Sequence, residues 1–158
     1  MIVLMRTKTD CEVASIATAT GKTYEESKKA LSWRDLWSWL ENPVFGNPWN
    51  LYLSLIWLGF WKRNIVLNDL LSGNCIPGKT VVLVHDSKNS NFSQHWVVWG
   101  GVYLGMHLLY WGDSKIARIV SPGRLKDYFL KGNPNCAFEV YRASIWRIVY
   151  EKIKSIFL

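Results

Sequence analysis

The cysteines and histidines of this chain are few enough to be weighed one at a time. There are three of each, namely Cys11, Cys75, Cys136, His85, His95 and His107. A cysteine can fill a core, form a disulfide, bind a metal or act as a nucleophile, and a nucleophile needs a base that is itself held in place. Three widely spaced cysteines fit a disulfide framework poorly and suit a reducing compartment, so we expect a cytoplasmic protein.

Cys11 is the cysteine whose position favours chemistry. It follows Asp10 and opens the alanine-rich run EVASIATAT. Thr9 with Glu12 makes a T-x-x-E capping box, and Asp10 is itself a preferred N-cap residue, so we expect a helix to begin at Thr9 or Asp10. Unpaired N–H groups in a first helical turn favour negative charge and lower the pKa of a thiol. Position alone leaves Cys11 either a nucleophile or a buried core residue.

His95 is the histidine best placed to serve as a base. It begins the expected strand SQHWVVWGG, and Asp113 ends the next expected strand, VYLGMHLLYWGD. If the two strands form a hairpin, their outer ends return side by side, which favours a contact between His95 and Asp113. His85 follows another strand and is the second choice, while His107 falls within a strand as a packed or surface residue. A structural role for His95 also stays open.

Other chemistries find less support in the sequence. The cysteines and histidines form no closely spaced ligand pairs, and no G-x-x-x-x-G-K-[ST] phosphate loop is present. We therefore expect no metal and no cofactor.

The elements expected to position Cys11 are helices. Its helix should end at Gly21, and a second capping box, Thr23 with Glu26, opens YEESKKAL as another helix. The stretch LYLSLIWLG is apolar on all sides, which predicts a buried helix that stops at Gly59.

Beyond Gly59 the pattern changes to that of strands. KTVVLVHD, SQHWVVWGG, VYLGMHLLYWGD and NCAFEVYRA are each typical of a strand, and the second and third should join through Gly100-Gly101. Helices followed by an antiparallel sheet predict an α+β domain.

Together these motifs resemble the papain-like cysteine peptidases that process bacteriocin leaders. That family includes peptidase domains of ABC transporters and small stand-alone bacterial and phage relatives. The resemblance lies in TDCEVASIATATGKTYEES, with its DCxxAxxAxxxG form, in a mid-chain LGF, and in HWVVWGG and LYWGDS. It implies a papain-like α+β fold and hydrolysis of a peptide or protein substrate. It also implies a triad of Cys11 as nucleophile, His95 as general base and acid, and Asp113 as the group that orients the imidazole.

Two positions depart from the family pattern. Relatives usually carry a glutamine six residues before the cysteine as an oxyanion donor, where this chain has Met5, with Arg6 beside it. They also often carry glycine after the cysteine, where this chain has Glu12. Loss of one oxyanion donor typically lowers the rate by about 100- to 1000-fold. The alternative is therefore a weak or inactive papain-like protein that binds a partner.

A segment rich in tryptophan offers a surface for such a partner. Six of the ten tryptophans fall within residues 33–61, namely Trp33, Trp37, Trp39, Trp49, Trp57 and Trp61. The spacing of four in Trp33 and Trp37, and again in Trp57 and Trp61, is that of a helix face. The rings can line the domain core and a groove wall, or they can contact a protein partner.

The C-terminal residues 143–158, ASIWRIVYEKIKSIFL, lie beyond a peptidase-like domain over residues 1–142. Residues 115–158 carry nine Lys and Arg against three Asp and Glu, which gives +6 of the chain's net +7. At 100° per residue, seven apolar side chains of the segment fall in an arc of about 140°. We expect this basic amphipathic helix to pack on its own domain; an anionic membrane surface, a nucleic acid or a partner groove is the alternative.

Overall fold

We describe the protein from a computed structural model. It describes residues 1–6, 10–38, 54–85, 94–113, 115–131, 137–144, 146, 149 and 150, and for residues 33–38, 94, 130 and 131 the backbone alone. The helices are α1 (Cys11–Thr20), α2 (Tyr24–Ser38), α4 (Leu67–Ser72) and α5 (Pro122–Lys131), with a further helical turn over residues 54–57. The strands are β1 (Phe60–Asn64), β2 (Thr80–His85), β3 (Gln94–Tyr103), β4 (Met106–Tyr110), β5 (Arg118–Val120) and β6 (Ala137–Arg142).

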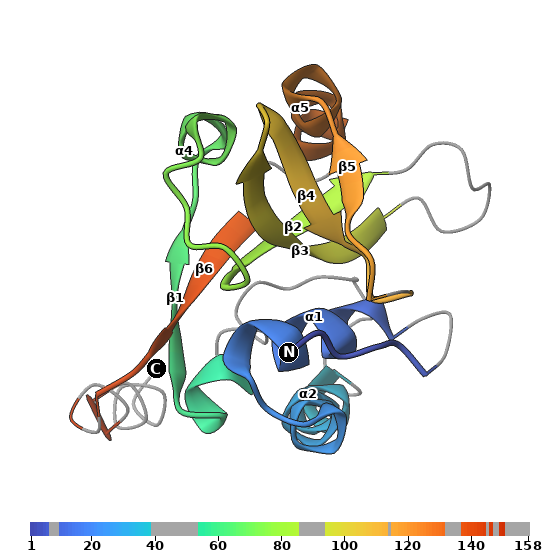
Figure 1. The fold of residues 1–158 in the computed structure, drawn as a ribbon. Coiled ribbons are helices and arrows are strands. Elements are labelled where there is room, and N and C mark those ends of the chain that lie inside the picture. The colour runs from blue at the N-terminus through green and yellow to red at the C-terminus, as the bar shows by residue number, and fades with distance from the viewer. Residues whose placement is uncertain are drawn as a thin grey trace.

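The described strands form a single six-stranded sheet in the order β1-β6-β2-β3-β4-β5, and every neighbouring pair is antiparallel. Helices α1 and α2 lie on one side of the sheet, and α4 and α5 lie on the other (Figure 1). The predicted α+β class with helices packed on an antiparallel sheet is therefore confirmed.

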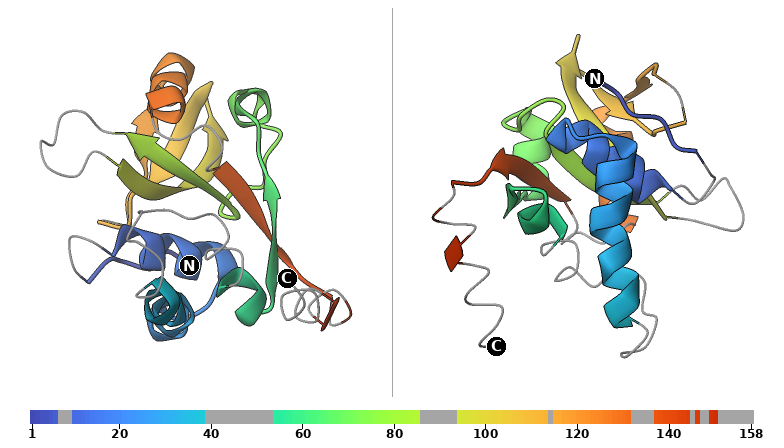
Figure 2. Two further views of the ribbon diagram at one scale, coloured as in Figure 1. Left: turned by 180° about the vertical axis from the view of Figure 1, so that it is seen from behind. Right: turned by 90° about the horizontal axis from the view of Figure 1, so that it is seen from below.

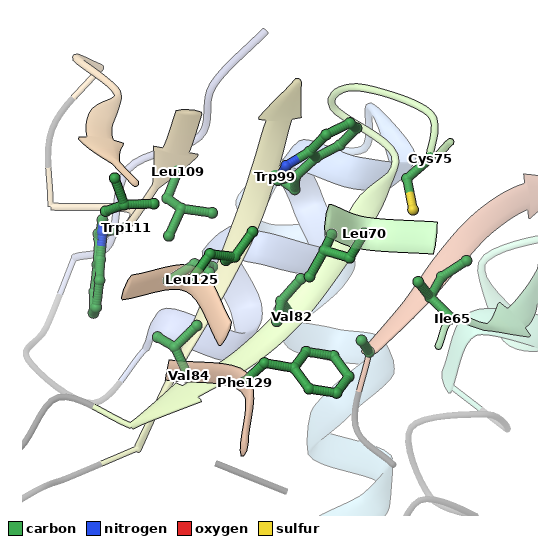
Figure 3. Close-up of a cluster of buried hydrophobic side chains, with 13 residues drawn as sticks. Ile65, Leu70, Cys75, Val82, Val84, Trp99, Leu109, Trp111, Leu125 and Phe129 are labelled. Carbon is green, nitrogen blue, oxygen red and sulfur yellow. The ribbon is translucent and has the colours of Figure 1, made fainter. Parts of the chain in front are cut away.

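The apolar side chains of the sheet face both helical layers. Towards α4 and α5, Val82 and Val84 of β2 pack in one cluster with Leu125 and Phe129 of α5 (Figure 3). Towards α1, Val81 and Val98 pack with residues of that helix in a second cluster. Strand side chains alternate between faces, so the continuous apolar run of β2 is what a strand covered on both faces requires.

Helix α1 lies close to the sheet because its inward face is made of small residues. Ala14, Ala17 and Ala19 are almost fully buried, and Ile16 provides the larger side chain of that face. The helix ends as predicted at Gly21, which has φ of 74° and donates its backbone N–H to the carbonyl of Ala17 at 2.9 Å. A short, tightly packed helix of this kind gives its first residue, Cys11, a defined place over the sheet.

The turn between β3 and β4 corrects the prediction that these strands join through Gly100-Gly101. β3 continues past both glycines, and the chain turns at Leu104 and Gly105, which have φ of 49° and 73°. The register shifts at the two glycines, which form a bulge. A Cβ at Gly100 would lie 2.6 Å from a ring carbon of Tyr110, so glycine is needed here for close approach rather than for a turn.

The expected helix ending at Gly59 is also only partly correct. Ser54, Leu55 and Ile56 are buried, but Trp57 is 61% exposed, so the segment is not apolar-buried on all sides. Trp57 lies in the helical turn and Trp61 in β1, so their spacing of four does not put them on one helix face. Of the other tryptophans of that segment, Trp39 and Trp49 lie outside the described residues, and only the backbone of Trp33 and Trp37 is described.

A buried carboxylate connects β6 to its neighbours. Glu139 has no exposed surface; it accepts hydrogen bonds from Arg63 of β1 at 2.8 Å, from the backbone N–H of Ile76 at 2.7 Å and from the Tyr141 hydroxyl. A buried charge needs such partners because its desolvation is otherwise costly. This network was not predicted from the sequence, because neither β1 nor α4 was expected as an element.

Candidate active site

The start of α1 is fixed against the start of β3. The Ser15 hydroxyl donates to the carbonyl of Trp96 at 2.9 Å, which joins the first turns of the helix to the strand. The chain before the helix is held on the same side, because the backbone N–H of Val3 donates to the Thr18 hydroxyl at 2.9 Å and that of Met5 to the Gly112 carbonyl at 2.8 Å. Cys11 therefore sits where the N-terminal segment, α1 and β3 meet.

The Cys11 thiol is partly exposed and lies among backbone donors. Burial raises the pKa of the thiol above its ordinary value, and the negative charge of Glu12 raises it further. Backbone hydrogen bonds from Trp96, Glu12 and Cys11 itself lower the pKa but do not outweigh the burial. The expectation that the helix N-terminus would lower this pKa is thus wrong in net direction, although the helical N–H groups do act in the predicted sense.

Cys75 offers a contrast with Cys11. It is 6% exposed, and burial together with the nearby charge of Glu139 raises its pKa to about 11. A thiol in such surroundings is inert at neutral pH. Cys136 lies outside the described residues. Of the two cysteines that the structure describes, Cys11 is the accessible one.

His95 lies on β3 one residue before Trp96, whose backbone bonds to the Cys11 thiol. The imidazole packs edge-on against Trp111, with ring centroids 5.6 Å apart. The ladder between β3 and β4 pairs Val98 with Tyr110, and continuing this register three residues outward would set His95 opposite Asp113. Such a continuation would agree with the contact that the sequence predicts between His95 and Asp113, and this contact stays a prediction.

The carboxylate of Asp113 pairs with Arg118 of β5. The Arg118 guanidinium also lies over the Trp111 ring, 4.5 Å from its centroid. Within the described part of the chain, no hydrogen bond joins Asp113 to His95 or His95 to Cys11. Arg118 and Trp111 therefore border the histidine and its expected partner. The sequence analysis named neither residue. β5, which carries Arg118, was not predicted, and a tryptophan within an expected strand is typical of a core residue.

The other two histidines differ from His95. His107 is almost completely buried, its Nδ1 accepts a hydrogen bond from the Trp99 indole at 3.1 Å, and burial lowers its pKa. It is a packed strand residue, as one of the two predicted alternatives had it. His85 ends β2 and is partly exposed.

The position at which the family usually carries a side-chain donor to the oxyanion has no such donor in this chain. Met5 occupies that position, and a Cβ at Gly112 would lie 3.0 Å from its Cγ. Arg6, the neighbouring alternative, pairs with Glu25 of α2 and stacks over the Tyr24 ring with its Cζ 4.3 Å from the centroid. Arg6 is thus engaged with α2, and backbone N–H groups at the start of α1 are the donors next to Cys11.

Comparison with models of known protein families gave no match, and comparison with curated proteins gave none either. Among solved structures, the chain is similar to the peptidase domain of Streptococcus ComA, a bi-functional ABC transporter involved in a quorum sensing pathway. The sequences are 18% identical and the TM-score is 0.61, over 89% of this chain and 96% of the other. At this identity the likeness concerns the fold. This chain has the α+β fold of a papain-like cysteine peptidase domain.

Proposed function

We propose that this protein is a thiol-dependent hydrolase that cuts a peptide or protein substrate with Cys11, His95 and Asp113. The observation that carries the proposal is the position of Cys11. Its thiol lies at the first turn of α1, within hydrogen-bonding reach of the backbone of the residue that follows His95, in a chain with the fold of a peptidase domain. Nucleophile and base on facing elements are what covalent acyl transfer requires.

In the proposed mechanism the Cys11 sulfur attacks the scissile carbonyl carbon while His95 accepts the thiol proton. The histidine then donates this proton to the departing amine, and water hydrolyses the thioester with His95 as the base. Because the pKa of Cys11 is raised, the resting thiol is protonated at neutral pH and the attack needs this base. Backbone N–H groups at the start of α1 stabilise the oxyanion.

Asp113 would orient the imidazole. The β3–β4 register, if continued beyond Val98 and Tyr110, would set it opposite His95, which supports that role. Its Oδ2 accepts from Arg118. Arg118 would then hold the carboxylate by one oxygen while the other turns to His95. Of the three proposed catalytic residues, Asp113 is therefore the one whose side chain would have to move most from its position in this structure.

The proposal is tested by a panel of peptide, ester and isopeptide substrates. Cys11→Ala and His95→Ala should abolish turnover, and Asp113→Ala should lower it less. His85→Ala is the matched control, because His85 lies on the strand paired with β3 and should leave the rate near wild type. An inactive His85→Ala with a normal His95→Ala would show that the base assignment is wrong.

A second function, binding without catalysis, has its own support. Met5 replaces the side-chain oxyanion donor of the family, and Glu12 adds a negative charge beside the thiol that raises its pKa. Both features would slow acyl transfer. If the wild type and Cys11→Ala behave alike on every substrate and in every biological assay, the protein is instead a papain-like protein that acts by binding a partner.

A further inference from the structure

The side chain of Arg118 has a defined position beside the proposed base. It lies on β5, the edge strand of the sheet, where its guanidinium stacks on the Trp111 ring with Cζ 4.5 Å from the ring centroid. It also pairs with the Asp113 carboxylate. The Trp111 ring in turn contacts the His95 imidazole edge-on, with centroids 5.6 Å apart. Arg118 therefore lies one aromatic ring away from the group that would accept the thiol proton.

The ring on which Arg118 stacks is itself held in place. Trp111 is only 5% exposed, and the Tyr128 ring of α5 packs against it edge-on, with centroids 5.9 Å apart. Arg124 stacks over Tyr128, 4.9 Å from the ring centroid, and its Nε donates to the Tyr128 hydroxyl at 2.9 Å. β5 leads directly into α5, so the two elements lie side by side (Figure 1), and Figure 2 shows them from behind. A buried ring thus positions the Arg118 guanidinium, in addition to the Asp113 carboxylate.

Arg118 can bind a second carboxylate besides that of Asp113. A guanidinium carries five N–H donors in one plane, and two of them can bind one carboxylate. The hydrogen bond from Arg118 to Asp113 joins Nη2 to Oδ2. The two side chains are 47% and 42% exposed, so a carboxylate can approach the guanidinium from solvent. An ion pair as exposed as this one is weak, which allows it to adjust when a second acid binds.

The charges on the two sides of the proposed site have opposite signs. Around Arg118, the exposed charged side chains between residues 113 and 127 are four bases and two acids, namely Lys115, Arg118, Arg124, Lys126, Asp113 and Asp127. Beside the thiol lie Asp10 and Glu12, and the charge of Glu12 acts on Cys11. A peptide with an acidic side chain on the His95 side of the scissile bond complements this arrangement.

We propose that Arg118 determines the specificity of the peptidase and selects substrates with an aspartate or glutamate side chain near the scissile bond. The guanidinium binds this carboxylate while it keeps its contact with Asp113. The inference rests on the proposed function, but the binding of a carboxylate at Arg118 can be measured without cleavage. In the alternative, Arg118 is structural and only joins β5 to the end of β4.

The first test is cleavage of a proteome-derived peptide library, with the cut sites identified by mass spectrometry. Sites cut by the wild type should carry aspartate or glutamate at one position close to the bond. For a cleaved glutamate peptide and its glutamine counterpart, kcat/KM should differ about tenfold, because the bond from a guanidinium to a carboxylate is charge-assisted. Arg118→Gln should abolish this difference. Arg118→Lys should keep part of it, since lysine retains the charge without the planar fork, and it serves as the test if Arg118→Gln does not fold.

Arg6 provides a matched control. It also pairs with a carboxylate, that of Glu25, and stacks on an aromatic ring, that of Tyr24, but both partners belong to α2. Arg6→Gln removes the same charge and should keep the preference for the glutamate peptide. Equal losses in Arg6→Gln and Arg118→Gln would mean that net charge sets the preference, and the inference would be wrong. Cleavage without enrichment of acidic residues would also overturn it, while the proposed function would stand.

The second test measures binding without turnover, in the full chain with Cys11→Ala. The probes are N-acetylglutamate methylamide and N-acetylglutamine methylamide, followed by NMR at the Nε–H of Arg118 and the indole N–H of Trp111. Arg118→Gln and Trp111→Phe assign these two signals. The glutamate compound should shift both signals, with a Kd at least about tenfold lower than that of the glutamine compound. Equal responses would overturn the inference whether or not the protein cleaves peptides. Selective binding of the glutamate compound by a protein that cleaves no peptide would confirm the carboxylate site and overturn the proposed function instead.

Discussion

Helices α1 and α2 begin at Cys11 and Tyr24, and their N-termini are built in opposite ways. At α2 the backbone N–H and the hydroxyl of Thr23 both donate to the Glu26 carboxylate at 2.9 Å, and the Glu26 N–H donates back to the Thr23 hydroxyl at 3.2 Å. This reciprocal capping box satisfies the first donors of the helix. It lowers the pKa of Glu26 to about 2, through the Thr23 backbone first and then the Lys22 ammonium and the Thr23 hydroxyl.

At α1 the side chain of the N-cap residue does not cap the helix. Asp10 makes no capping hydrogen bond to the helix, and its carboxylate instead accepts from the Tyr24 hydroxyl, at the start of α2. The backbone N–H groups of Cys11 and Glu12, in the first turn, instead lower the pKa of the Cys11 thiol, although burial outweighs them. The backbone N–H groups at the two helix starts therefore interact with different groups: a neighbouring carboxylate at α2 and the Cys11 thiol at α1.

The two helix starts therefore have different roles, the one at α2 in the stability of the fold and the one at α1 in the proposed chemistry. A capped end satisfies its backbone donors and contributes to the stability of the fold. An end whose donors point at a cysteine is arranged for the charge that develops on that sulfur and on the carbonyl it attacks. Tyr24 serves both ends, because it begins α2 and keeps the Asp10 carboxylate engaged beside the nucleophile helix.

The largest effect that this comparison predicts is the selectivity of thiol labelling. Iodoacetamide at neutral pH should modify Cys11 of the native protein first, because it is partly exposed and receives helical N–H groups, whereas Cys75 is buried with a pKa of about 11. We expect Cys136 to be unreactive as well. Mass spectrometry of the labelled peptides measures the order, and Cys11→Ala should lose the early label while Cys75→Ala keeps it. Preferential labelling of Cys75 or Cys136 would contradict the special character assigned to the α1 end.

A smaller effect should come from the charge beside the thiol. Glu12 raises the pKa of Cys11 through its negative charge, so Glu12→Gln should lower that pKa and speed alkylation at neutral pH several-fold. The pH dependence of the labelling rate measures this, since the curve should move to lower pH in the variant. Glu25→Gln is the control, because Glu25 is absent from the groups that act on Cys11 and pairs with Arg6. A slower reaction in Glu12→Gln would mean that this carboxylate supports the thiol rather than opposing the thiolate.

Local sequence patterns predicted the start of α2, the end of α1 and the central strands of the sheet. The capping box expected at the start of α1 involves Thr9, which lies outside the described residues, and Asp10 makes no side-chain cap there. Thr23 and Glu26 form a capping box within four residues. Gly21 ends α1 because it adopts a positive φ, which glycine allows. The sequence of β2 is apolar throughout because helices cover both faces of that strand. Each of these features depends on neighbours in the chain, which is why a pattern can reveal it.

Contacts between distant segments were not predictable in this way. Arg118 reaches Asp113 only because β5 lies beside β4, and Tyr24 reaches Asp10 only because α2 packs on α1. The net direction of the Cys11 pKa was missed for the same reason, since burial by the rest of the fold outweighs the helix N-terminus. Gly100 and Gly101 look like a turn in the sequence, and only the Tyr110 ring across the hairpin shows why a bulge needs them.

The smallest predicted effect concerns the capping box at the start of α2. It should change the stability of the fold and leave the reactivity of Cys11 unchanged. The folded-state pKa of Glu26, about 2, lies below its ordinary value of 4.5, so folding favours the charged carboxylate. Its stabilising contribution should be complete above about pH 4.5 and be lost as the pH falls towards 2. Glu26→Gln should therefore melt a few degrees below the wild type at neutral pH, and the difference should vanish near pH 2. Thermal unfolding followed by circular dichroism from pH 7 to 2 measures this. Because Glu26 serves α2 alone, the variant should label Cys11 at the wild-type rate at neutral pH, and a changed rate would mean that the two helix ends are coupled.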